Sequence, residues 1–390
     1  MRSRLGGFVR ITKFAIPEIL FGRGSMAHVG ACAAALGGET VFLVSDPGLA
    51  QAGWLDVVRG HLAQAGLTCV EFLQVQPNPR DCQVHAGAAL YRESGADVIV
   101  AVGGGSPMDT AKGIGILVSN GGNIAEYEGA NRVTHPLPPM LFMPTTAGSG
   151  SDLSQFAIIT DVQRKLKMSL ISRSLIPNIS IIDPDFLQSA GRGLLVDSCI
   201  DALAHAVESF ISTAASPFTE TQARLALRLW NEHAERGCFA GEPAALEGLC
   251  LASAAASMSF SNASLGVGHA LAHAFGGRFD MPHGGMHAIL LPVVLRFNAS
   301  HSPAKTAEIL GLLFPDHSFA GPAAVEQGIA LLYERFSTLG APVRLGAVLP
   351  PQAKEQLPEL CQAAVKDACM LTNPRPAGAE QLLEICQEAW

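Results

Sequence analysis

Strand-like runs of apolar residues occur only in the first half of this chain, and this feature most constrains its fold. Residues 40–45 (TVFLVS) and 98–102 (VIVAV) have the continuous apolar character of strands that are buried on both faces. Helical patterns lie near residues 54–65 and 82–94. Because strands and helices alternate over short connections, the first half is predicted to be an α/β domain with a parallel sheet.

The pattern changes after about Leu187. No further strand signal follows, and long segments rich in alanine and leucine continue to the last residue, Trp390. The second half is therefore predicted to be all-helical. We place the boundary near Asp185, which gives domains of residues 1–185 and 186–390.

Composition excludes several classes of protein. The net charge of −8 and the lack of a basic run argue against a nucleic-acid partner. No apolar run reaches about 18 residues, so no membrane span is expected, and residues 1–14 lack the apolar segment of a signal peptide. Nine scattered cysteines without a C-x-x-C pair favour reduced thiols in a cytoplasmic protein.

Four histidines lie in residues 264–291 (SLGVGHALAHAFGGRFDMPHGGMHAILL). His269 and His273 are four residues apart in a run of helix formers, so both rings leave one helix face. His283 lies between a proline and two glycines, which favours a bend that returns its ring to that helix.

A second pair with the same spacing, Asp201 and His205, lies in DALAHAVES. One carboxylate and several imidazoles suit a divalent metal of borderline softness. The alternative is that these are ordinary surface or buried core pairs. Cys199 lies near the pair, but a small buried residue explains it more simply than a ligand.

The run Gly103–Lys112 (GGGSPMDTAK) follows a strand and opens a helix. Glycines let a phosphate approach the backbone closely, and a helix N-terminus favours an anion. Ser106 is predicted to cap that helix, with Pro107 in its first turn. The alternative is a tight turn that binds nothing. The spacing is not G-x-G-x-x-G, so the usual dinucleotide fingerprint is absent.

Two further loops fit a nucleotide. Asp46 ends an early strand, where a carboxylate can bind the adenosine ribose and repel a 2′-phosphate, so NAD is expected. Residues 144–152 (PTTAGSGSD) form a second loop of small hydroxyl residues after a strand. Each loop by itself is also explained as ordinary turn chemistry.

Together these motifs resemble the iron-containing (group III) alcohol dehydrogenase family. The resemblance spans nearly the whole chain, through FAIPEILFGRG, GGGSPMDTAKG, PTTAGSGSD, ITDVQRKLKM, DALAHAVES, ASPFTE, GHALAHAFGG and PHGGMHAILLP. It implies a dinucleotide-binding α/β domain (1–185), a helical metal-binding and substrate domain (186–390), and a metal in the cleft. The implied reaction is metal-dependent hydride transfer between NAD(H) and a small alcohol or aldehyde, in a homodimer or higher homo-oligomer.

The resemblance also implies roles for individual residues. The metal ligands are Asp201, His205, His269 and His283, and His273 is a non-ligand histidine beside the substrate and nicotinamide. Toward the pyrophosphate and nicotinamide lie Gly104, Gly105, Ser106 and Asp109. The adenosine is lined by Thr145, Thr146 and Ser149, and Lys167 reaches the ribose. Fe2+ is the family's usual metal, and Zn2+ suits the same ligands.

The chain departs from the family pattern at three places. Ser149 and Asp152 replace threonine and glutamate, the stretch before Asp201 is SAGRGLLVDSCI, and His287 replaces a frequent asparagine. His287 either packs at the start of a helix or lines the pocket and binds a second polar group of the substrate. Two alternatives to a free-NAD dehydrogenase are a hydroxyacid–oxoacid transhydrogenase that retains its nicotinamide, and a non-catalytic scaffold or sensor.

Overall fold

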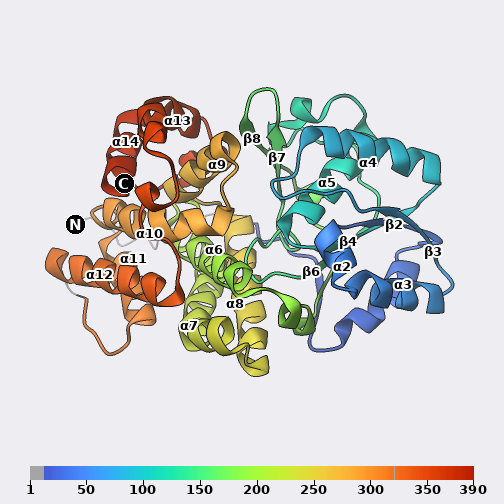
Figure 1. Cartoon of the computed structure of the whole chain (residues 1–390), viewed down its shortest axis with the longest axis horizontal. Helices are drawn as coiled ribbons and strands as arrows, with labels where there is room; N and C mark the ends of the chain where they lie inside the picture. The colour runs from blue at the N-terminus through green and yellow to red at the C-terminus, as the bar shows by residue number, and fades with distance from the viewer. Residues whose placement is uncertain (1–12, 320) are drawn as a thin grey trace, which may run out of the picture.

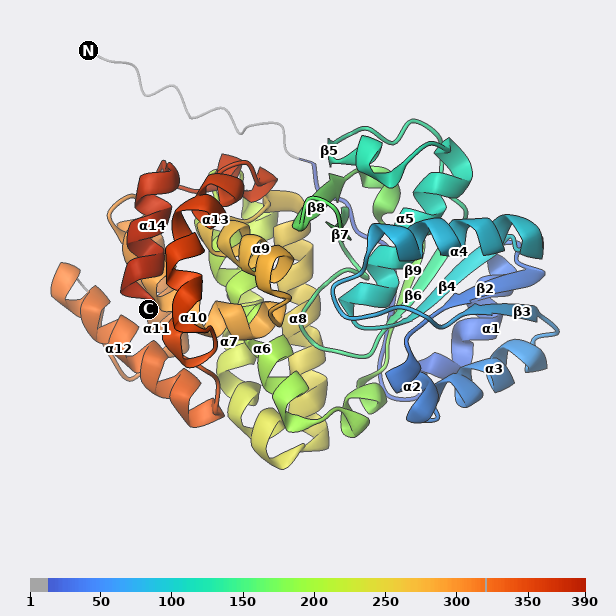
Figure 2. The ribbon, with the colours of Figure 1, turned by 45° about the horizontal axis from the view of Figure 1, so that its top comes forward.

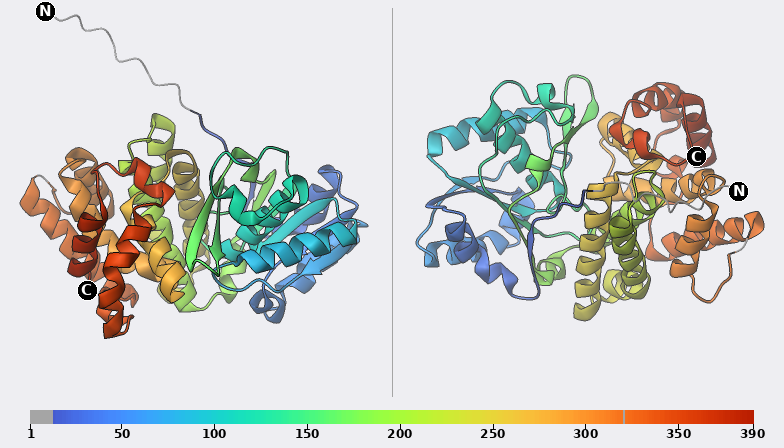
Figure 3. Two further views of the ribbon diagram at one scale, coloured as in Figure 1. Left: turned by 90° about the horizontal axis from the view of Figure 1, so that it is seen from above. Right: turned by 180° about the vertical axis from the view of Figure 1, so that it is seen from behind.

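The computed structural model describes residues 13–319 and 321–390. Residues 1–12 lie outside this range, and they include most of the segment for which no signal peptide is expected. An α/β half and a helical half lie side by side, blue to green and yellow to red in Figure 1, and both views of Figure 3 show the same arrangement.

A six-stranded sheet forms the centre of the first half. Its strand order is β1-β9-β6-β4-β2-β3, and every paired neighbour is parallel. The strands are β1 (Glu18–Phe21), β2 (Thr40–Val44), β3 (Thr68–Phe72), β4 (Val98–Gly103), β6 (Met140–Pro144) and β9 (Ile179–Ile182).

Helices cover both faces of this sheet (Figure 2). In β4, Val98, Val100 and Val102 pack toward α1 and α3, whereas Ile99 and Ala101 pack toward α4 and α5. This double coverage explains why the strands are apolar throughout. The helices of this half are α1 (Val29–Ala35), α2 (Pro47–Gln51), α3 (Trp54–Gln64), α4 (Asp81–Ser94) and α5 (Gly105–Asn120).

The carboxyl ends of β2, β4 and β6 lie next to one another because β4 pairs with both neighbours. Gly104 and Thr145 follow directly after β4 and β6, and Asp46 lies two residues after the end of β2. Ligands of open α/β sheets bind in the crevice outside the strands' carboxyl ends. The topology therefore brings three predicted nucleotide loops to one edge.

A second sheet, β5-β8-β7, is built on a hairpin. Strands β7 (Phe156–Asp161) and β8 (Leu166–Ile171) are antiparallel, and β5 (Gly129–Ala130) adds a short parallel edge. The hairpin packs closely on helix α9 (Val267–Phe279) of the helical half. A Cβ at Gly277 would lie 2.9 Å from the Leu166 Cα, and one at Gly276 would lie 2.8 Å from the Lys167 Cε. Glycine at both positions allows this approach.

The second half is built from helices, which confirms the predicted fold class of a parallel α/β half followed by a helical half. Its helices are α6 (Arg192–Ile211), α7 (Pro217–Ala240), α8 (Pro243–Ala263), α9 (Val267–Phe279), α10 (His283–Ala299), α11 (Pro303–Leu313), α12 (Pro322–Leu339), α13 (Leu357–Ala364) and α14 (Ala379–Glu388).

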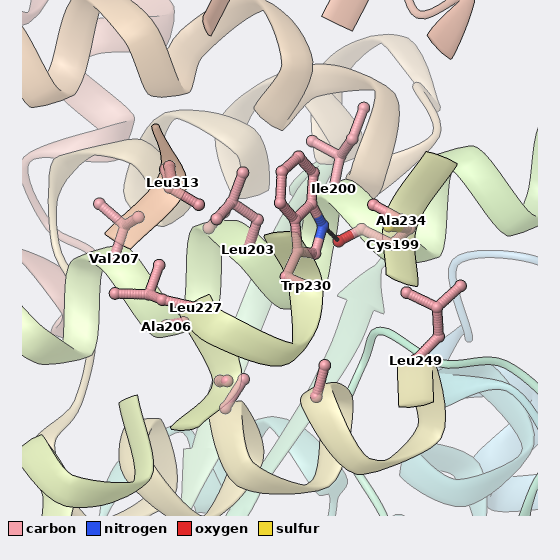
Figure 4. Packing of buried hydrophobic residues seen from close by; sticks show 14 of the residues in the cluster. Cys199, Ile200, Leu203, Ala206, Val207, Leu227, Trp230, Ala234, Leu249 and Leu313 are labelled. Carbon is pink, nitrogen blue, oxygen red and sulfur yellow. Dashed lines mark hydrogen bonds between the residues drawn. The ribbon is translucent and has the colours of Figure 1, made fainter. Parts of the chain in front are cut away.

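Helix α6 is fixed in place by a core with α7 and α8. Figure 4 shows Trp230 among residues of α6, and its indole N–H donates to the Cys199 carbonyl at 2.8 Å. Cys199 is fully buried in this core, and burial raises the pKa of its thiol well above the usual value. Cys199 is therefore a packing residue, and the opposite face of α6 presents Asp201 and His205.

Within the described ranges, α8 is long and apolar enough to cross a membrane by length and composition. However, 78% of its apolar window is buried inside the protein, which is the environment of a core helix.

Candidate active site and metal centre

Three helices bring the predicted metal ligands together. Helix α6 carries Asp201 and His205 one turn apart, α9 carries His269, and α10 begins at His283. The Asp201 Oδ1 lies 3.7 Å from the His283 Nε2 and 4.0 Å from the Nε2 atoms of both His205 and His269. Two donors bound to one transition metal lie no more than about 4 Å apart, twice a metal–nitrogen distance of ~2.0–2.1 Å. All three distances from the Asp201 Oδ1 are within that limit. Asp201, His269 and His283 belong to a group of potential ligand atoms that all lie within 4.8 Å of one another, whereas His205 is not in that group.

Unsatisfied polar atoms at this point support a cation. The Asp201 Oδ1, His269 Nε2 and His287 Nε2 are buried without a hydrogen-bond partner. Buried polar atoms in native proteins are almost always paired, so such a cluster calls for an explanation. A carboxylate oxygen and imidazole nitrogens are donors that fit Fe2+ or Zn2+. The residues present thus fit the metal implied by the sequence.

Neighbouring groups fix two of the imidazoles by their other nitrogen. The His205 Nδ1 lies 3.1 Å from the Gly148 carbonyl oxygen, and the His269 Nδ1 contacts the Glu208 carboxylate. Donation through Nδ1 leaves the Nε2 lone pair free to bind a metal. Glu208 also accepts from the backbone N–H groups of Gly268 and His269, at 2.7 and 3.1 Å.

Burial shifts the proton affinities of the whole cluster. It lowers the pKa of His205 to about 3 and the pKa values of His269 and His283 well below the usual value. Repulsion between neighbouring imidazoles lowers these pKa values further. Burial also raises the pKa of Asp201 to about 7, against the opposing charge of Lys167. The imidazoles are therefore neutral near physiological pH, which is the form that binds a metal.

Helix α10 approaches α6 closely through a glycine. A Cβ at Gly284 would lie 2.0 Å from the Asp197 carbonyl oxygen, one turn before Asp201. The expected return of the His283 ring to the helix of His269 and His273 is confirmed, because its centroid lies 5.5 and 5.3 Å from theirs. The position expected for the bend, at Gly284 and Gly285, is wrong, because both glycines lie in the first turn of α10, which starts at His283. The close contact between two backbones accounts for the glycine.

His287 lies in the metal cluster rather than in the substrate pocket. Its Nε2 is 3.7 Å from the Asp201 Oδ1. Asp201, His269, His283 and His287 each offer one ligand atom, and these atoms all lie within 4.8 Å of one another. His287 lines neither of the two cavities described below. The interpretation of His287 as a group that binds the substrate therefore finds no geometric support.

A cavity of about 200 Å³ opens beside the cluster. Phe156, Phe260 and Leu265 give it an apolar side, and His273 lies in its wall. The His273 Nδ1 lies 2.8 Å from an Asp367 carboxylate oxygen. Burial raises the pKa of Asp367, but the charge and hydrogen bond of His273 outweigh this and hold the pKa below its usual value.

Lys167 and Asp109 line the same small cavity, and neither lines the larger cavity described next. Burial lowers the pKa of Lys167 to about 8, while the carboxylates of Asp109 and Asp201 oppose that shift. Asp109 accepts hydrogen bonds from the Ser151 hydroxyl and, at 3.0 Å, from the Ile158 N–H. Asp109 thus ties α5 to β7 as well as facing the cavity.

A larger cavity of about 700 Å³ runs along the carboxyl edge of the sheet and joins the smaller one. Its lining includes the other predicted cofactor residues, namely Asp46, Gly104, Gly105, Ser106, Thr145, Thr146 and Ser149. Both cavities are lined by Ser149, Asp201 and His283, so a ligand in the larger one would end at the cluster.

The loop after β4 differs from the sequence expectation in its capping. Helix α5 starts at Gly105 with Gly104 as its N-cap, so Ser106 lies inside the first turn and is not the cap. A Cβ at Gly105 would lie 3.0 Å from the Ser149 Cβ, so the loops after β4 and β6 are in contact. Asp46 caps α2 by accepting from the Leu49 N–H at 3.1 Å.

Two functional side chains were missed in the sequence. Glu208 lies seven residues after Asp201, on the same face of α6, and this helical spacing was a usable signal. Asp367 lies 94 residues after His273, just before a short 3-10 helix, and it has no local pattern that relates it to the site.

Comparison with known proteins identifies the family. Residues 17–184 match the family described as "Iron-containing alcohol dehydrogenase", and residues 195–390 match "Fe-containing alcohol dehydrogenase family, C-terminal". The chain is 35% identical to the 1,3-propanediol dehydrogenase of Klebsiella pneumoniae, over 98% of this chain and 99% of that protein.

Two further relatives agree. The NAD-dependent methanol dehydrogenase of Bacillus methanolicus is 33% identical, over 97% of this chain and 100% of its own length. A crystal structure of a 1,3-propanediol oxidoreductase superposes with a TM-score of 0.93 at 35% identity, covering 98% of this chain and 100% of that one. Both halves of the chain, its length and its fold thus lead to one assignment: the chain belongs to the iron-containing alcohol dehydrogenase family.

Proposed function

We propose that this protein interconverts a short alcohol and its aldehyde with NAD(H), at the point where the two cavities meet. The chain is a metal-dependent oxidoreductase of the alcohol dehydrogenase type, as its family membership implies. The observation that carries the assignment to this point is the convergence of imidazole Nε2 atoms on the Asp201 carboxylate beside both cavities.

We propose that Asp201, His205, His269 and His283 hold the metal. When bound, a divalent metal polarises the substrate oxygen as a Lewis acid, and the nicotinamide carries the hydride. The chain's contribution is orientation: Glu208 and the Gly148 carbonyl hold two of the rings with Nε2 toward Asp201. The ligands reach the site from three helices, so packing of α6 against α9 and α10 sets their spacing.

NAD is proposed to lie along the larger cavity. The free N–H groups at the N-terminus of α5 suit its pyrophosphate, and glycine at 104 and 105 leaves room for it. Asp46 lies in the same lining, where its charge disfavours a 2′-phosphate. Thr145, Thr146 and Ser149 are proposed to contact the adenosine half, and Lys167 the ribose nearest the smaller cavity.

His273 is proposed to move the proton of the substrate hydroxyl. It lines the smaller cavity, and Asp367 accepts a hydrogen bond from its Nδ1–H, which leaves the Nε2 to exchange a proton. A carboxylate in this position fixes the tautomer and the ring orientation of a catalytic histidine. Asp367 is thus a positioning residue that acts through His273.

The substrate is proposed to be short and to carry a second oxygen. The smaller cavity has a volume of only about 200 Å³ and is lined on its apolar side by Phe156 and Phe260, which favours a short chain. Asn78 and Lys167 supply polar atoms to the same lining. A pocket with such groups rejects analogues that leave them unpaired. One relative is named for 1,3-propanediol, and another for methanol, which has no second oxygen.

The remaining assignments concern the whole protein. We propose a domain boundary at residues 185 and 186, a homodimer or higher homo-oligomer, and a cytoplasmic location in line with the nine free cysteines. Both curated relatives described above are named as dehydrogenases, which gives no support to a transhydrogenase that retains its cofactor.

One experiment tests the proposal. The purified protein would be stripped with a chelator, reloaded with Fe2+ or Zn2+, and assayed for NAD reduction with 1,3-propanediol and 1-propanol, which have the same number of carbons. We expect activity to return only with the metal, and a higher kcat/KM for the diol. Full activity of the stripped protein would refute the metal assignment, and equal or better turnover of 1-propanol would refute the substrate assignment.

A further inference from the structure

His287 is buried in the metal cluster with one ring nitrogen unused. It lies one turn after His283 on α10 and is 1% exposed. Its Nε2 has no hydrogen-bond partner and lies 3.7 Å from the Asp201 Oδ1, the same distance as the His283 Nε2. An unpaired buried acceptor is unfavourable unless another group satisfies it.

The rings around His287 belong to the same cluster. Its ring centroid lies 4.1 Å from that of His269 and 4.9 Å from that of His283. The Asp201 Oδ1 and the His269 Nε2 are also buried without partners. Three unsatisfied atoms from three helices thus face one another, and a single cation would satisfy all three.

We propose that His287 is a fifth protein ligand of the metal, together with Asp201, His205, His269 and His283. This inference rests on the proposed function, because it requires that the cluster holds a metal.

His287 does not simply take the place of His205. The Gly148 carbonyl fixes the His205 Nδ1 at 3.1 Å, and the His205 Nε2 lies 4.0 Å from the Asp201 Oδ1. His205 also lines the smaller cavity, whereas His287 lies deeper and lines neither cavity. His205 stands outside the group of ligand atoms that lie within 4.8 Å of one another, which contains His287. It nevertheless belongs to the proposed shell, because its Nε2 lies no farther from the Asp201 Oδ1 than that of His269.

A five-ligand shell has a consequence for the choice of metal. Five protein donors and one substrate oxygen make six, while Zn2+ strongly prefers four ligands and expands to five only in some transition states. Removing the His287 ring should therefore lower the affinity for Fe2+ more than the affinity for Zn2+. The ratio of the two affinities is a quantity that a purely packing role of His287 would leave unchanged.

The test uses the full-length protein loaded with Co2+, whose visible spectrum reports coordination number. His287→Asn should strengthen the weak bands of a high-coordinate ion and lower the metal affinity by at least about tenfold, as the loss of a group that supports a metal does. His205→Asn should also lower the affinity. The matched control is His273→Asn, since the His273 Nδ1 is bound to Asp367 and its ring lies 6.3 Å from that of His269.

Two results would overturn the inference. One is a His287→Asn protein with the spectrum, affinity and Fe2+ to Zn2+ ratio of the unaltered chain. The other is a His205→Asn protein that is likewise unchanged, which would leave a four-ligand shell containing His287.

A second measurement needs no variant and so does not depend on how His287→Asn folds. In the proton NMR spectrum of the unaltered Co2+ protein, each ligated histidine contributes one paramagnetically shifted ring N–H. Four such signals are expected, and three would contradict a fifth ligand. If the unaltered chain binds no metal, the proposed function fails; if it binds one but shows three signals, only this inference fails.

Discussion

The contact between Gly284 and α6 allows a sharp test of how the helices set the metal site. Replacing Gly284 with alanine would place a Cβ 2.0 Å from the Asp197 carbonyl oxygen, 2.5 Å from its carbon and 3.0 Å from its Cα. These are backbone atoms in the middle of α6, so no side-chain rotation relieves the clash. The residue after it is a matched control, because a Cβ at Gly285 would lie 3.4 Å from the nearest Asp197 atom.

The size of the effect follows from these distances. Heavy atoms pack best at about 3.5–4.0 Å, so α10 must move from α6 by roughly 1 Å or more. Overpacking of this kind destabilises a protein by ~1–3 kcal/mol. Gly285→Ala keeps the packing and gains helix propensity of up to about 1 kcal/mol. We therefore expect the two variants to differ in stability by about 2 kcal/mol or more, in opposite directions from the unaltered chain.

The same displacement should weaken the metal site. His283 is carried by α10 and Asp201 by α6, and ligand distances must be correct to about 0.2 Å. Gly284→Ala should lower the metal affinity by at least about tenfold, and Gly285→Ala should leave it unchanged. Urea unfolding of the metal-free proteins and competition with a chelator measure the two effects. If the two variants agree in both measurements, the reasoning from the close approach is refuted.

Four further predictions concern the cofactor, the carboxylate that holds the His269 ring, a buried lysine and the proton path. Asp46→Ser retains an N-cap for α2 but removes the charge, so the ratio of kcat/KM for NADP to that for NAD should rise; an unchanged ratio would count against a ribose contact. Glu208→Gln should lower the metal affinity by about 10- to 100-fold while the helices stay folded, which a chelator titration with circular dichroism checks. Burial lowers the pKa of Lys112 from 10.5 to about 8. Below pH 8 the folded protein holds a buried charge, which lowers the free energy of unfolding by its full amount. Between pH 8 and 10.5 the folded state loses this proton while the unfolded state keeps it, so the free energy of unfolding rises with pH. The unaltered chain should therefore gain up to about 3 kcal/mol of stability relative to Lys112→Met across that interval, and a pH-independent difference would contradict this. Asp367→Asn should lower kcat by about tenfold or more without loss of metal or of NAD affinity, whereas equal losses in all three would indicate a structural role.

Much of the fold was predictable because its signals are local. The buried strands β2 and β4 read as apolar runs, and the spacing of the helical patterns fixed the alternation of the first half. The short helix α2 was missed because it follows a strand end directly and its five residues are too few for a periodic pattern. The bend expected at Gly284 was wrong because glycine there permits a close contact between helices rather than a turn.

The site was predictable where two of its residues share a helix. Asp201 and His205 are one turn apart, and so are His283 and His287. The spacing therefore predicts that the two side chains of each pair lie on the same face of a helix. The contact between pairs depends on tertiary packing, which no spacing reveals. The sequence therefore left two roles open for His287. The helical periodicity correctly places His287 one turn after His283 on the same face of α10. Only the packing of α9 against α10 shows that its ring contacts that of His269 and lines neither cavity.

The contact between Glu208 and His269 explains why the cluster needs α6 to be rigid. Helix α6 contributes Asp201 and His205 to the cluster and, through Glu208, also holds the ring of His269 on α9. A shift of α6 would therefore move both ligands on its own face and the carboxylate that aligns a third. The opposite face of α6 is fixed by its core with α7 and α8, where the Trp230 N–H donates to the Cys199 carbonyl. Apolar packing on one face of α6 thus holds Asp201 and His205 in fixed positions on its other face. Hydride transfer requires such fixed positions, because the reacting groups must be held in the correct orientation.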